Sequence, residues 1–448
     1  MISDTQHLLL FIEITSIKED IIMQKRAIII SIFVLLFSSP ILCLAESLDK
    51  QEALKQALQD NPSYKAALSQ IESAAGVRSQ VSLLPNPKTV VEVENIGGSG
   101  ERKGFERTEV TLGLEQKIEL AGKRRIRTEV ADYGYKIVQE EALLEALKLL
   151  SETEYAFIRM AVAKERILLA DDRLQLANQT QMIVQKRVSA AVSPDMELAK
   201  ADIEKIEAEI EKHHVEEEYN IARNDLARLL GLENSEGLDI NADLSTLPKL
   251  IDHQSVLDAV ESAPQLRSQE FAKMKARSSL DLAKATGVPD PTVGLGVRQF
   301  FDNDDTALVA TLSFPLPLFD RNQGAIKSAH ANVTRAEAQA RATGLSIYQS
   351  ATQAWELFYV ELDITRHYRD EIIPTARKAY DQADEGYNLG AFEFLDLLDA
   401  QRTLNRVQSE YLDNILELYE AKVQIDFLTG TYKPLIEEIS QKSVEGER

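Results

Sequence analysis

Two aspartates in the stretch GAFEFLDLLDAQ, residues 390–401, are the side chains whose type and spacing most clearly suggest a chemical role. Asp396 and Asp399 are three residues apart, so on a helix they lie on one face. If several copies of the chain surround a passage, such carboxylates form rings that attract cations and exclude anions. The alternative interpretation is that both aspartates belong to the solvated face of a coiled coil.

Metal and catalytic chemistry is poorly supported by the rest of the sequence. His213 and His214 are adjacent, so on a helix their side chains point about 100° apart, and no cysteine or third histidine accompanies them. The sequence contains no GxSxG, Walker or HExxH motif. We therefore expect no metal site, no cofactor and no enzymatic activity.

The overall charge argues against nucleic acid as a partner. The chain has 50 Lys and Arg against 72 Asp and Glu, a formal net charge of −22, which repels a phosphate backbone. A short basic group, Lys123, Arg124 and Arg125 in LAGKRR, lies where a predicted strand becomes a predicted helix. A lipid headgroup contact and a structural pairing at the helix start are both open for this group.

The N-terminal region has the pattern of a secretory signal peptide. Lys25 and Arg26 precede an apolar run that ends at Leu44, and cleavage is expected after Ala45. Residues 1–45 are therefore expected to be removed on export. An uncleaved membrane anchor is the alternative, although the run is short for a membrane span.

Two further features of this region bear on the mature chain. Residues 1–22, which precede Met23, look like an upstream mis-start. Cys43 is the only cysteine, and the large Leu42 before it argues against a lipid attachment site there. The mature chain then has no thiol and can form no disulfide.

The chain contains an internal repeat. Three pairs of similar stretches are each separated by about 200 residues, far more than the periods of solenoid proteins. The pairs are LLPNPKTVVEV (83–93) with GVPDPTVGLGV (287–297), TLGLEQKIELAGKRR (111–125) with TLSFPLPLFDRNQG (311–324), and LARLLGLE (226–233) with IDFLTGTY (425–432). We divide the mature chain into a first repeat at 46–250, a second repeat at 251–434 and a polar C-terminal tail at 435–448.

Each repeat is expected to contain long helices. Residues 121–188 contain no proline and almost no glycine, and at 1.5 Å per residue such a helix is about 100 Å long. Further helices are expected at 48–83, 197–230, 255–285, 323–388 and 395–428. The last has Leu397, Leu404, Tyr411, Leu418 and Ile425 at heptad spacing, which is typical of coiled-coil packing.

Four short strands interrupt the helices, at about residues 88–97, 107–118, 291–301 and 305–316. Apolar and polar residues alternate in each over about 9–11 residues, a length that crosses a bilayer when the strand is tilted. The apolar row, which we expect to face lipid, consists of Val91, Val93, Val110, Leu112, Leu114, Val293, Leu295, Val297, Leu308, Leu312 and Phe314. Two soluble hairpins resting on helices are the alternative.

Four strands cannot close a barrel by themselves. An open edge within lipid leaves backbone groups unpaired, so several chains would have to build the barrel together. Three chains supply twelve strands, enough for an open pore, whereas two supply only eight, too few for a passage. The expected fold is mainly α with a small transmembrane β part, with long antiparallel coiled-coil helices and four strands per chain.

The duplication, the two hairpins and the long paired helices resemble the TolC-like outer-membrane factors of Gram-negative bacteria, over about residues 47–432. The stretches LPNPKTVVEVENIGGSG, QKIELAGKRR and PLPLFDRNQG are similar to the cobalt-zinc-cadmium (CzcC-type) branch of that family. The resemblance implies a homotrimer with a twelve-stranded barrel in outer-membrane lipid and an α-helical periplasmic tunnel. It also implies two protein partners, a periplasmic adaptor protein and an inner-membrane RND pump.

The resemblance also implies roles for particular residues. Acidic rings close the periplasmic entrance in this family, and Asp396 and Asp399 match the ring positions, whereas Glu197 and Lys200 stand there in the first repeat. Adaptor docking is implied for two helix-turn-helix tips, made of Ala190, Ala191, Val192, Leu389, Gly390, Ala391 and Phe392. Packing within its own turn is the alternative for Phe392.

The expected function is that of a passive exit duct in a tripartite efflux pump, carrying heavy-metal cations. Such a duct needs no catalytic residue, because the inner-membrane pump supplies the driving force. One alternative is an exit duct for multidrug or type I protein secretion. Another is an exported coiled-coil protein with a structural role and no channel.

Overall fold

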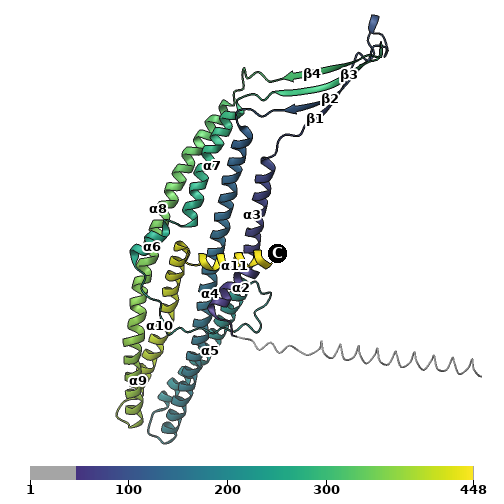
Figure 1. Ribbon diagram of the computed structural model, residues 1–448. Helices are drawn as coiled ribbons and strands as arrows, with labels where there is room; N and C mark the ends of the chain where they lie inside the picture. The colour runs from purple at the N-terminus through teal and green to yellow at the C-terminus, as the bar shows by residue number, and fades with distance from the viewer. Residues whose placement is uncertain (1–46, 447–448) are drawn as a thin grey trace, which may run out of the picture. The chain divides into compact units, whose positions relative to one another are not determined.

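The computed structural model describes residues 47–446 of the 448-residue chain. The predicted signal peptide, including Cys43, and the last two residues lie outside the described part. From Leu48 onward the chain forms one unit of long helices that carries a single small sheet (Figure 1). Among the described residues, no helix is both long and apolar enough to span a membrane.

The helices of the first repeat are α2 (Lys50–Asp60), α3 (Pro62–Val81), α4 (Lys123–Ser189) and α5 (Asp195–Leu229). The helix expected at 48–83 is divided in two at Asn61. This residue is extended, and its side-chain oxygen accepts hydrogen bonds from the backbone N–H groups of Ser63 and Tyr64. Asn61 thus ends one helix and caps the next, as an asparagine before a proline favours.

The helices of the second repeat are α6 (His253–Val260), α7 (Pro264–Thr286), α8 (Gln323–His367), α9 (Ile373–Asn388), α10 (Phe394–Thr429) and α11 (Lys433–Gly446). The helix expected at 323–388 is interrupted by a π-helical turn at Tyr368–Ile372. Pro374 follows this turn and has no N–H group for the bond that a regular α-helix requires.

The expected polar C-terminal tail forms the helix α11 over much of its length. Leu435, Ile436 and Ile439 lie three or four residues apart and pack against the main core. This short apolar stripe favours a docked helix, which the polar composition of the segment obscured.

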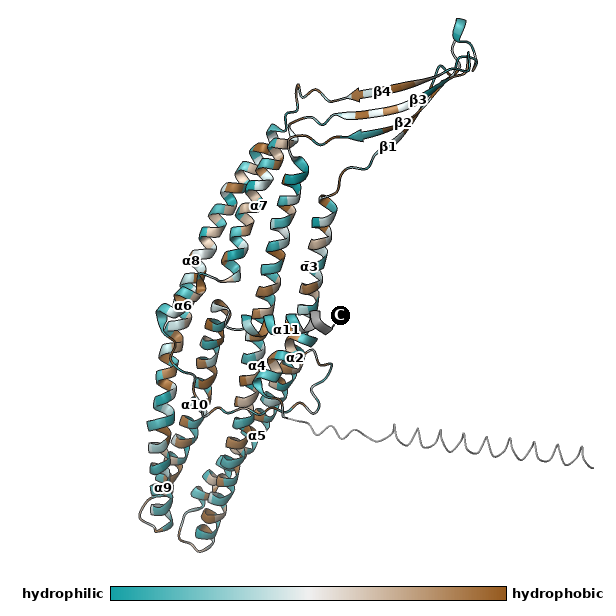
Figure 2. Cartoon of the chain, in the orientation of Figure 1, coloured by the Kyte–Doolittle hydropathy of each residue, from teal (hydrophilic) through white to brown (hydrophobic). Residues whose placement is uncertain are grey.

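The main core lies where α2, α4, α5 and α10 meet. Small alanines alternate there with large side chains such as Phe157, Met160 and Leu226, all of them buried. The heptad leucines Leu397, Leu404 and Leu418 of α10 are buried, so the coiled-coil pattern positions this helix against its neighbours. Figure 2 shows hydrophilic positions along the outer faces of the same helices.

Four antiparallel strands form the sheet in the order β1-β2-β3-β4. They are β1 (Lys88–Glu94), β2 (Glu109–Lys117), β3 (Thr292–Phe300) and β4 (Thr306–Ser313). The central β2–β3 pair joins the hairpins of the two repeats into one sheet. The four strands span 7, 9, 9 and 8 residues, so β2 and β3 reach the expected length of about 9–11 residues and β1 and β4 are shorter. Among the described strands, β1 and β4 are the edge strands and have a neighbour on one side only. The backbone N–H and C=O groups on their outer sides therefore have no partner strand within the sheet.

Candidate pore and docking surfaces

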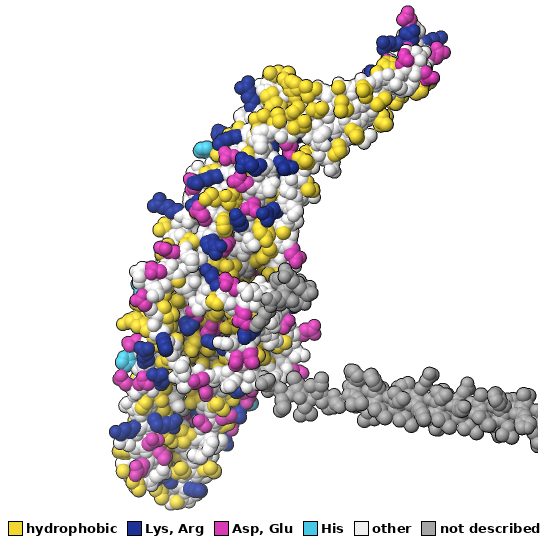
Figure 3. Space-filling view, viewed as in Figure 1, with side chains coloured by type: hydrophobic (Ala, Val, Ile, Leu, Met, Phe, Trp, Pro, Cys, Tyr) yellow, Lys and Arg dark blue, Asp and Glu magenta, His cyan; other side chains and the backbone are white. Residues whose placement is uncertain are grey.

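The apolar residues predicted to face lipid lie on one face of the sheet. Residues directly opposite each other in the ladder share a face, and the register pairs Val91 with Leu112, Leu112 with Val297, and Val297 with Leu308. All the predicted residues are exposed except Val110, which is half-buried. Figure 3 shows hydrophobic side chains along the sheet. Contact of this face with lipid remains a prediction.

The other face of the sheet carries a cluster of charged residues around Arg298 of β3. The Arg298 guanidinium lies 2.8 Å from a carboxylate oxygen of Glu94, 2.9 Å from one of Glu109 and 3.9 Å from one of Glu92. Its Nε also donates to the hydroxyl of Thr111 at 2.8 Å. Arg298 therefore connects three strands on the side opposite the apolar row. We named no role for it from the sequence, although the alternation of polar residues along β3 gave a signal.

The three basic residues at the start of α4 differ in their surroundings, so the two interpretations left open by the sequence, a structural pairing and a lipid headgroup contact, apply to different residues. Lys123 is buried, and its Nζ donates to the Asp290 carboxylate at 2.7 Å and to the Val288 carbonyl at 2.5 Å. Arg124 and Arg125 are exposed. Lys123 is therefore a structural residue that holds the segment before β3 against α4, and only the two arginines are placed to reach a headgroup.

The two helix-turn-helix tips have the same backbone structure. Val192 donates its N–H to the carbonyl of Arg187 at 2.9 Å, and Ala391 makes the equivalent bond to Gly386 at 2.8 Å. The residue before each donor is left-handed, Ala191 with φ 56° and Gly390 with φ 76°. This is the Schellman helix end, which favours glycine and here holds an alanine in the first tip.

Apolar side chains are exposed at both tips. Val192 is 65% exposed and Leu389 is 78% exposed. Phe392 is 49% exposed, and one edge of its ring packs onto Gly386, where an added Cβ would lie 2.2 Å from the ring. The alternative of local packing therefore accounts for part of Phe392, while Val192 and Leu389 remain available to a partner.

The two predicted gate residues lie at the start of α10, and both are exposed. The Asp396 carboxylate accepts a hydrogen bond from the backbone N–H of Glu393 at 3.0 Å, as part of a capping box. Asp396 therefore has a structural role that we did not predict. Both carboxylates lie close to the tip. A role for them in closing the entrance remains a prediction.

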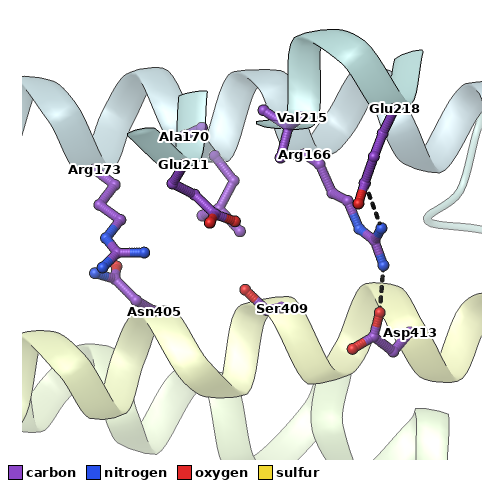
Figure 4. Close-up of a pocket in the computed structure, with 10 residues that line it drawn as sticks. Arg166, Ala170, Arg173, Glu211, Val215, Glu218, Asn405, Ser409 and Asp413 are labelled. Atoms are coloured by element: carbon purple, nitrogen blue, oxygen red, sulfur yellow. Dashed lines mark hydrogen bonds and ion pairs between the residues drawn. The ribbon is translucent and has the colours of Figure 1, made fainter. Parts of the chain in front are cut away.

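The two hairpins, α4–α5 and α9–α10, are tied together along their length. Near the tips the Arg187 guanidinium lies 4.8 Å from the centre of the Tyr387 ring. Farther along, Arg166 of α4 donates to Glu218 of α5 at 2.8 Å and also to Asp413 of α10. Figure 4 shows both bonds at one end of a cavity of about 210 Å³ between these helices. Among the described residues, no three His, Cys, Asp or Glu side chains are close enough to hold a metal ion.

A buried charge network joins the two repeats at the main core. The Glu154 carboxylate of α4 is 2% exposed. One of its oxygens lies 3.0 Å from Lys50 Nζ and 4.0 Å from Lys422 Nζ, and the other accepts from the Tyr432 hydroxyl at 2.6 Å. Asp426, also buried, pairs with Lys422. Sequence reasoning missed this network, because Glu154 lies in the polar stretch SETE, residues 151–154, and looks like a surface residue.

The two buried carboxyls of the network differ in acidity. Burial would raise the pKa of Glu154, but Lys422, Lys50 and Tyr432 together outweigh burial and lower it. Burial raises the pKa of Asp426, because the attraction of Lys422 is not sufficient to offset it. Glu154 is thus the carboxylate that the surrounding charges stabilise.

Comparison with known proteins gives the context for this geometry. The family model for outer membrane efflux proteins matches residues 53–232 and 256–431. The chain belongs to the outer membrane efflux protein family. This efflux-family chain is 26% identical over 386 residues to the cobalt-zinc-cadmium resistance protein CzcC of Cupriavidus metallidurans, covering 86% of this chain and 91% of CzcC.

Other relatives agree with this result. The efflux-family chain is 26% identical over 288 residues to the nickel and cobalt resistance protein CnrC of the same organism, covering 64% of this chain and 68% of CnrC. The solved CmeC outer membrane channel of Campylobacter jejuni has the same fold, with a TM-score of 0.75 at 15% identity over 87% of this chain and 89% of CmeC. The predicted resemblance and fold class are confirmed, and family membership places the chain in the Gram-negative outer membrane.

Proposed function

We propose that this efflux-family chain is the passive outer-membrane exit duct of a tripartite efflux system, and that its cargo is heavy-metal cations. The observation that best supports a duct is the difference between the two faces of the sheet. One face is a continuous apolar surface and the other holds Arg298 with three carboxylates. A sheet with one lipid-compatible face and one hydrated face suits the wall of a transmembrane barrel.

The number of subunits follows from the open edges of this sheet. β1 and β4 each have one neighbour among the described strands, so their outer backbone groups need strands from other copies. A homotrimer closes a ring of twelve strands, which is wide enough for a passage. The trimer's helices would then continue the passage into the periplasm.

The cargo class rests on the relatives and on charge. CzcC and CnrC carry cobalt, zinc, cadmium and nickel resistance in their names, and the chain has a formal net charge of −22. In a trimer Asp396 and Asp399 would form two rings of three carboxylates just inside the tip, which favour cations over anions.

The partners would meet the duct at its tips. Val192 and Leu389 present exposed apolar side chains on two turns of matching backbone structure, which suits docking of a periplasmic adaptor protein. The inner-membrane RND pump would supply the energy, so the duct itself would need none.

Fractionation and planar-bilayer recording test the proposed duct. We expect recovery with the outer membrane as a trimer, and cation-selective conductance from the purified protein. Substituting Asp396→Ala together with Asp399→Ala should lower cation preference, whereas Glu197→Ala, at the equivalent site of the first tip, should change it less. Recovery as a soluble periplasmic monomer contradicts the duct, and unchanged selectivity in the double variant removes the two aspartates from the gate.

A further inference from the structure

The internal repeat creates two equivalent strand-to-helix junctions. The first exit (residues 118–122) leads from β2 to α4, and the second exit (residues 314–322) leads from β4 to α8. The first linker (residues 82–87) leads from α3 to β1, and the second linker (residues 287–291) leads from α7 to β3. The two linkers share a proline-flanked centre, and each exit ends in a left-handed residue, Gly122 or Asn322.

Within the chain, the first exit packs against the second linker. Ile118 donates its N–H to the carbonyl of Pro291 at 2.9 Å, and Leu120 donates its N–H to the Asp290 carboxylate at 2.9 Å. Lys123 donates to the same carboxylate. This junction is buried, since Asp290 and Lys123 are each less than a tenth exposed.

The remaining two segments, the first linker and the second exit, are mostly exposed. In the first linker Asn86 is exposed, where the second linker has the buried Asp290, and Leu84 is 64% exposed. In the second exit Leu316 is 68% exposed and Phe319 is 91% exposed. Each chain therefore presents one exposed linker and one exposed exit.

The order of the elements prevents these two segments from meeting within one chain. Contacts run from α3 to α4, from α4 to α7 and from α7 to α8, in the same order as the strands (Figure 1). The first linker therefore lies at the β1–α3 edge of this layer, and the second exit lies at the β4–α8 edge. A second copy that presents its β1–α3 edge to β4–α8 would repeat the arrangement of the in-chain junction.

We propose that the boundary between subunits is built as a second version of the in-chain junction, in which Asn86 of one copy meets the second exit of the next copy near Gln323. This inference rests on the oligomer proposed above and assigns residues to its interface. Asn86 takes the position of Asp290, and Gln323 takes the position of Lys123, because the repeat aligns these residues. The Gln323 Nε2 donates to the carbonyl of Phe319 at 3.1 Å and carries a second hydrogen for this contact.

The residue types fit an interface that forms between folded chains. Three charged residues of the in-chain junction correspond to neutral ones at the boundary, namely Lys117 to Pro317, Lys123 to Gln323 and Asp290 to Asn86, whereas the neutral Leu120 and Ala121 correspond to Asp320 and Arg321. Burying free charges on association carries a desolvation cost, whereas exposed apolar side chains favour association. The buried ion pair between Asp290 and Lys123 is thus replaced at the boundary by two amides, which cost less to bury when folded chains associate.

Cysteine crosslinking tests the assignment in the full chain. Asn86→Cys with Gln323→Cys, treated with a short bismaleimide, should give covalent dimers and trimers on a reducing gel, and neither single variant should. The matched control pairs Asn86→Cys with Arg124→Cys, an exposed position next to the in-chain exit, and should give no bands between chains. Non-covalent trimers without crosslinked bands, or a crosslink within one chain, would overturn the inference and leave the proposed duct intact. Monomers throughout would contradict both.

A charge exchange provides a second measurement that does not depend on crosslinking. Asn86→Asp alone and Gln323→Lys alone each place an unpaired charge at the boundary, so each should lower the temperature at which the trimer dissociates in detergent. The double variant recreates the Asp290–Lys123 pair between subunits and should recover most of that loss. Additive losses in the double variant would contradict the proposed contact.

Discussion

The buried network around Glu154 makes a sharp prediction about stability. Glu154→Gln keeps the size of the side chain and a group that can accept from Tyr432, but it removes the charge that faces Lys50 and Lys422. The substitution Asp426→Asn removes the other buried carboxylate of the same network. The pair is matched, because each exchange replaces one buried carboxylate by its amide.

The expected magnitudes differ because the surroundings of the two carboxyls differ. Removing one partner of a buried ion pair costs about 3 kcal/mol, the lower end of the usual range, and we choose this end because Lys50 is partly exposed. For a chain of this size that lowers the apparent melting temperature on the order of 5 °C. Asp426→Asn should cost much less, because burial already disfavours the charged form of Asp426 and Glu154 repels it.

The dependence on pH follows with the same sign. The folded-state pKa of Glu154 is lowered, so its contribution to stability is present above the unfolded pKa and is lost as pH falls through the folded pKa. The folded-state pKa of Asp426 is raised, so the contribution of Asp426 to stability becomes less favourable as pH rises from its unfolded pKa through its folded pKa. Glu154→Gln should therefore flatten the acid loss of stability.

Thermal unfolding of the purified protein in detergent, at a fixed scan rate and from acid to neutral pH, measures these effects. We expect Glu154→Gln to melt below wild type at neutral pH and Asp426→Asn to melt close to it. Equal losses for the two variants would refute the reasoning, because they would show that the network does not distinguish the two carboxyls. An unchanged melting temperature for Glu154→Gln would show that the three contacts contribute nothing net.

Three further predictions concern the sheet, the junction and the tips. Arg298→Gln removes one positive charge beside three carboxylates, so reversal potentials in planar bilayers should shift toward greater cation preference, and a shift toward anions would contradict a pore-facing position. Asp290→Asn leaves the buried Lys123 without its carboxylate and should lower the yield of folded protein in the outer membrane, with partial recovery when Lys123→Gln is added; no loss would contradict a structural role. Val192→Asp with Leu389→Asp should weaken capture of the cognate adaptor without changing trimer formation, and unchanged capture would exclude these tips as the docking surface.

The sequence predicted the fold class well because its signals were long or repeated. The uninterrupted helical pattern after residue 121 corresponds to the 67-residue helix α4. Alternation in four short runs placed Val91, Leu112 and Leu308 on one face, because a strand has a strict period of two. The long helix and the alternating strands each depend on a pattern over many residues, so one residue that departs from the pattern does not change the prediction.

The interruptions and the buried charges could not be predicted in the same way. The breaks at Asn61 and near Pro374 each have a local signal, Pro62 or Pro374, but a proline can start, bend or end a helix, so the signal alone does not say which. Lys123 and Glu154 look like surface residues in the sequence, and their burial depends on Asp290 and Tyr432, which lie far away along the chain. Contacts of this kind follow from tertiary packing, so only the structure identifies them.

Measuring the metal content of cells is the best test of whether the chain is an exit duct for heavy-metal cations. Cells of the native host lacking this gene would be challenged with zinc, cobalt or cadmium, and retained metal would be measured by mass spectrometry. We expect cells without the gene to retain more metal than wild type, and the intact gene to restore the wild-type level. Unchanged metal content together with increased retention of an organic compound would contradict this expectation.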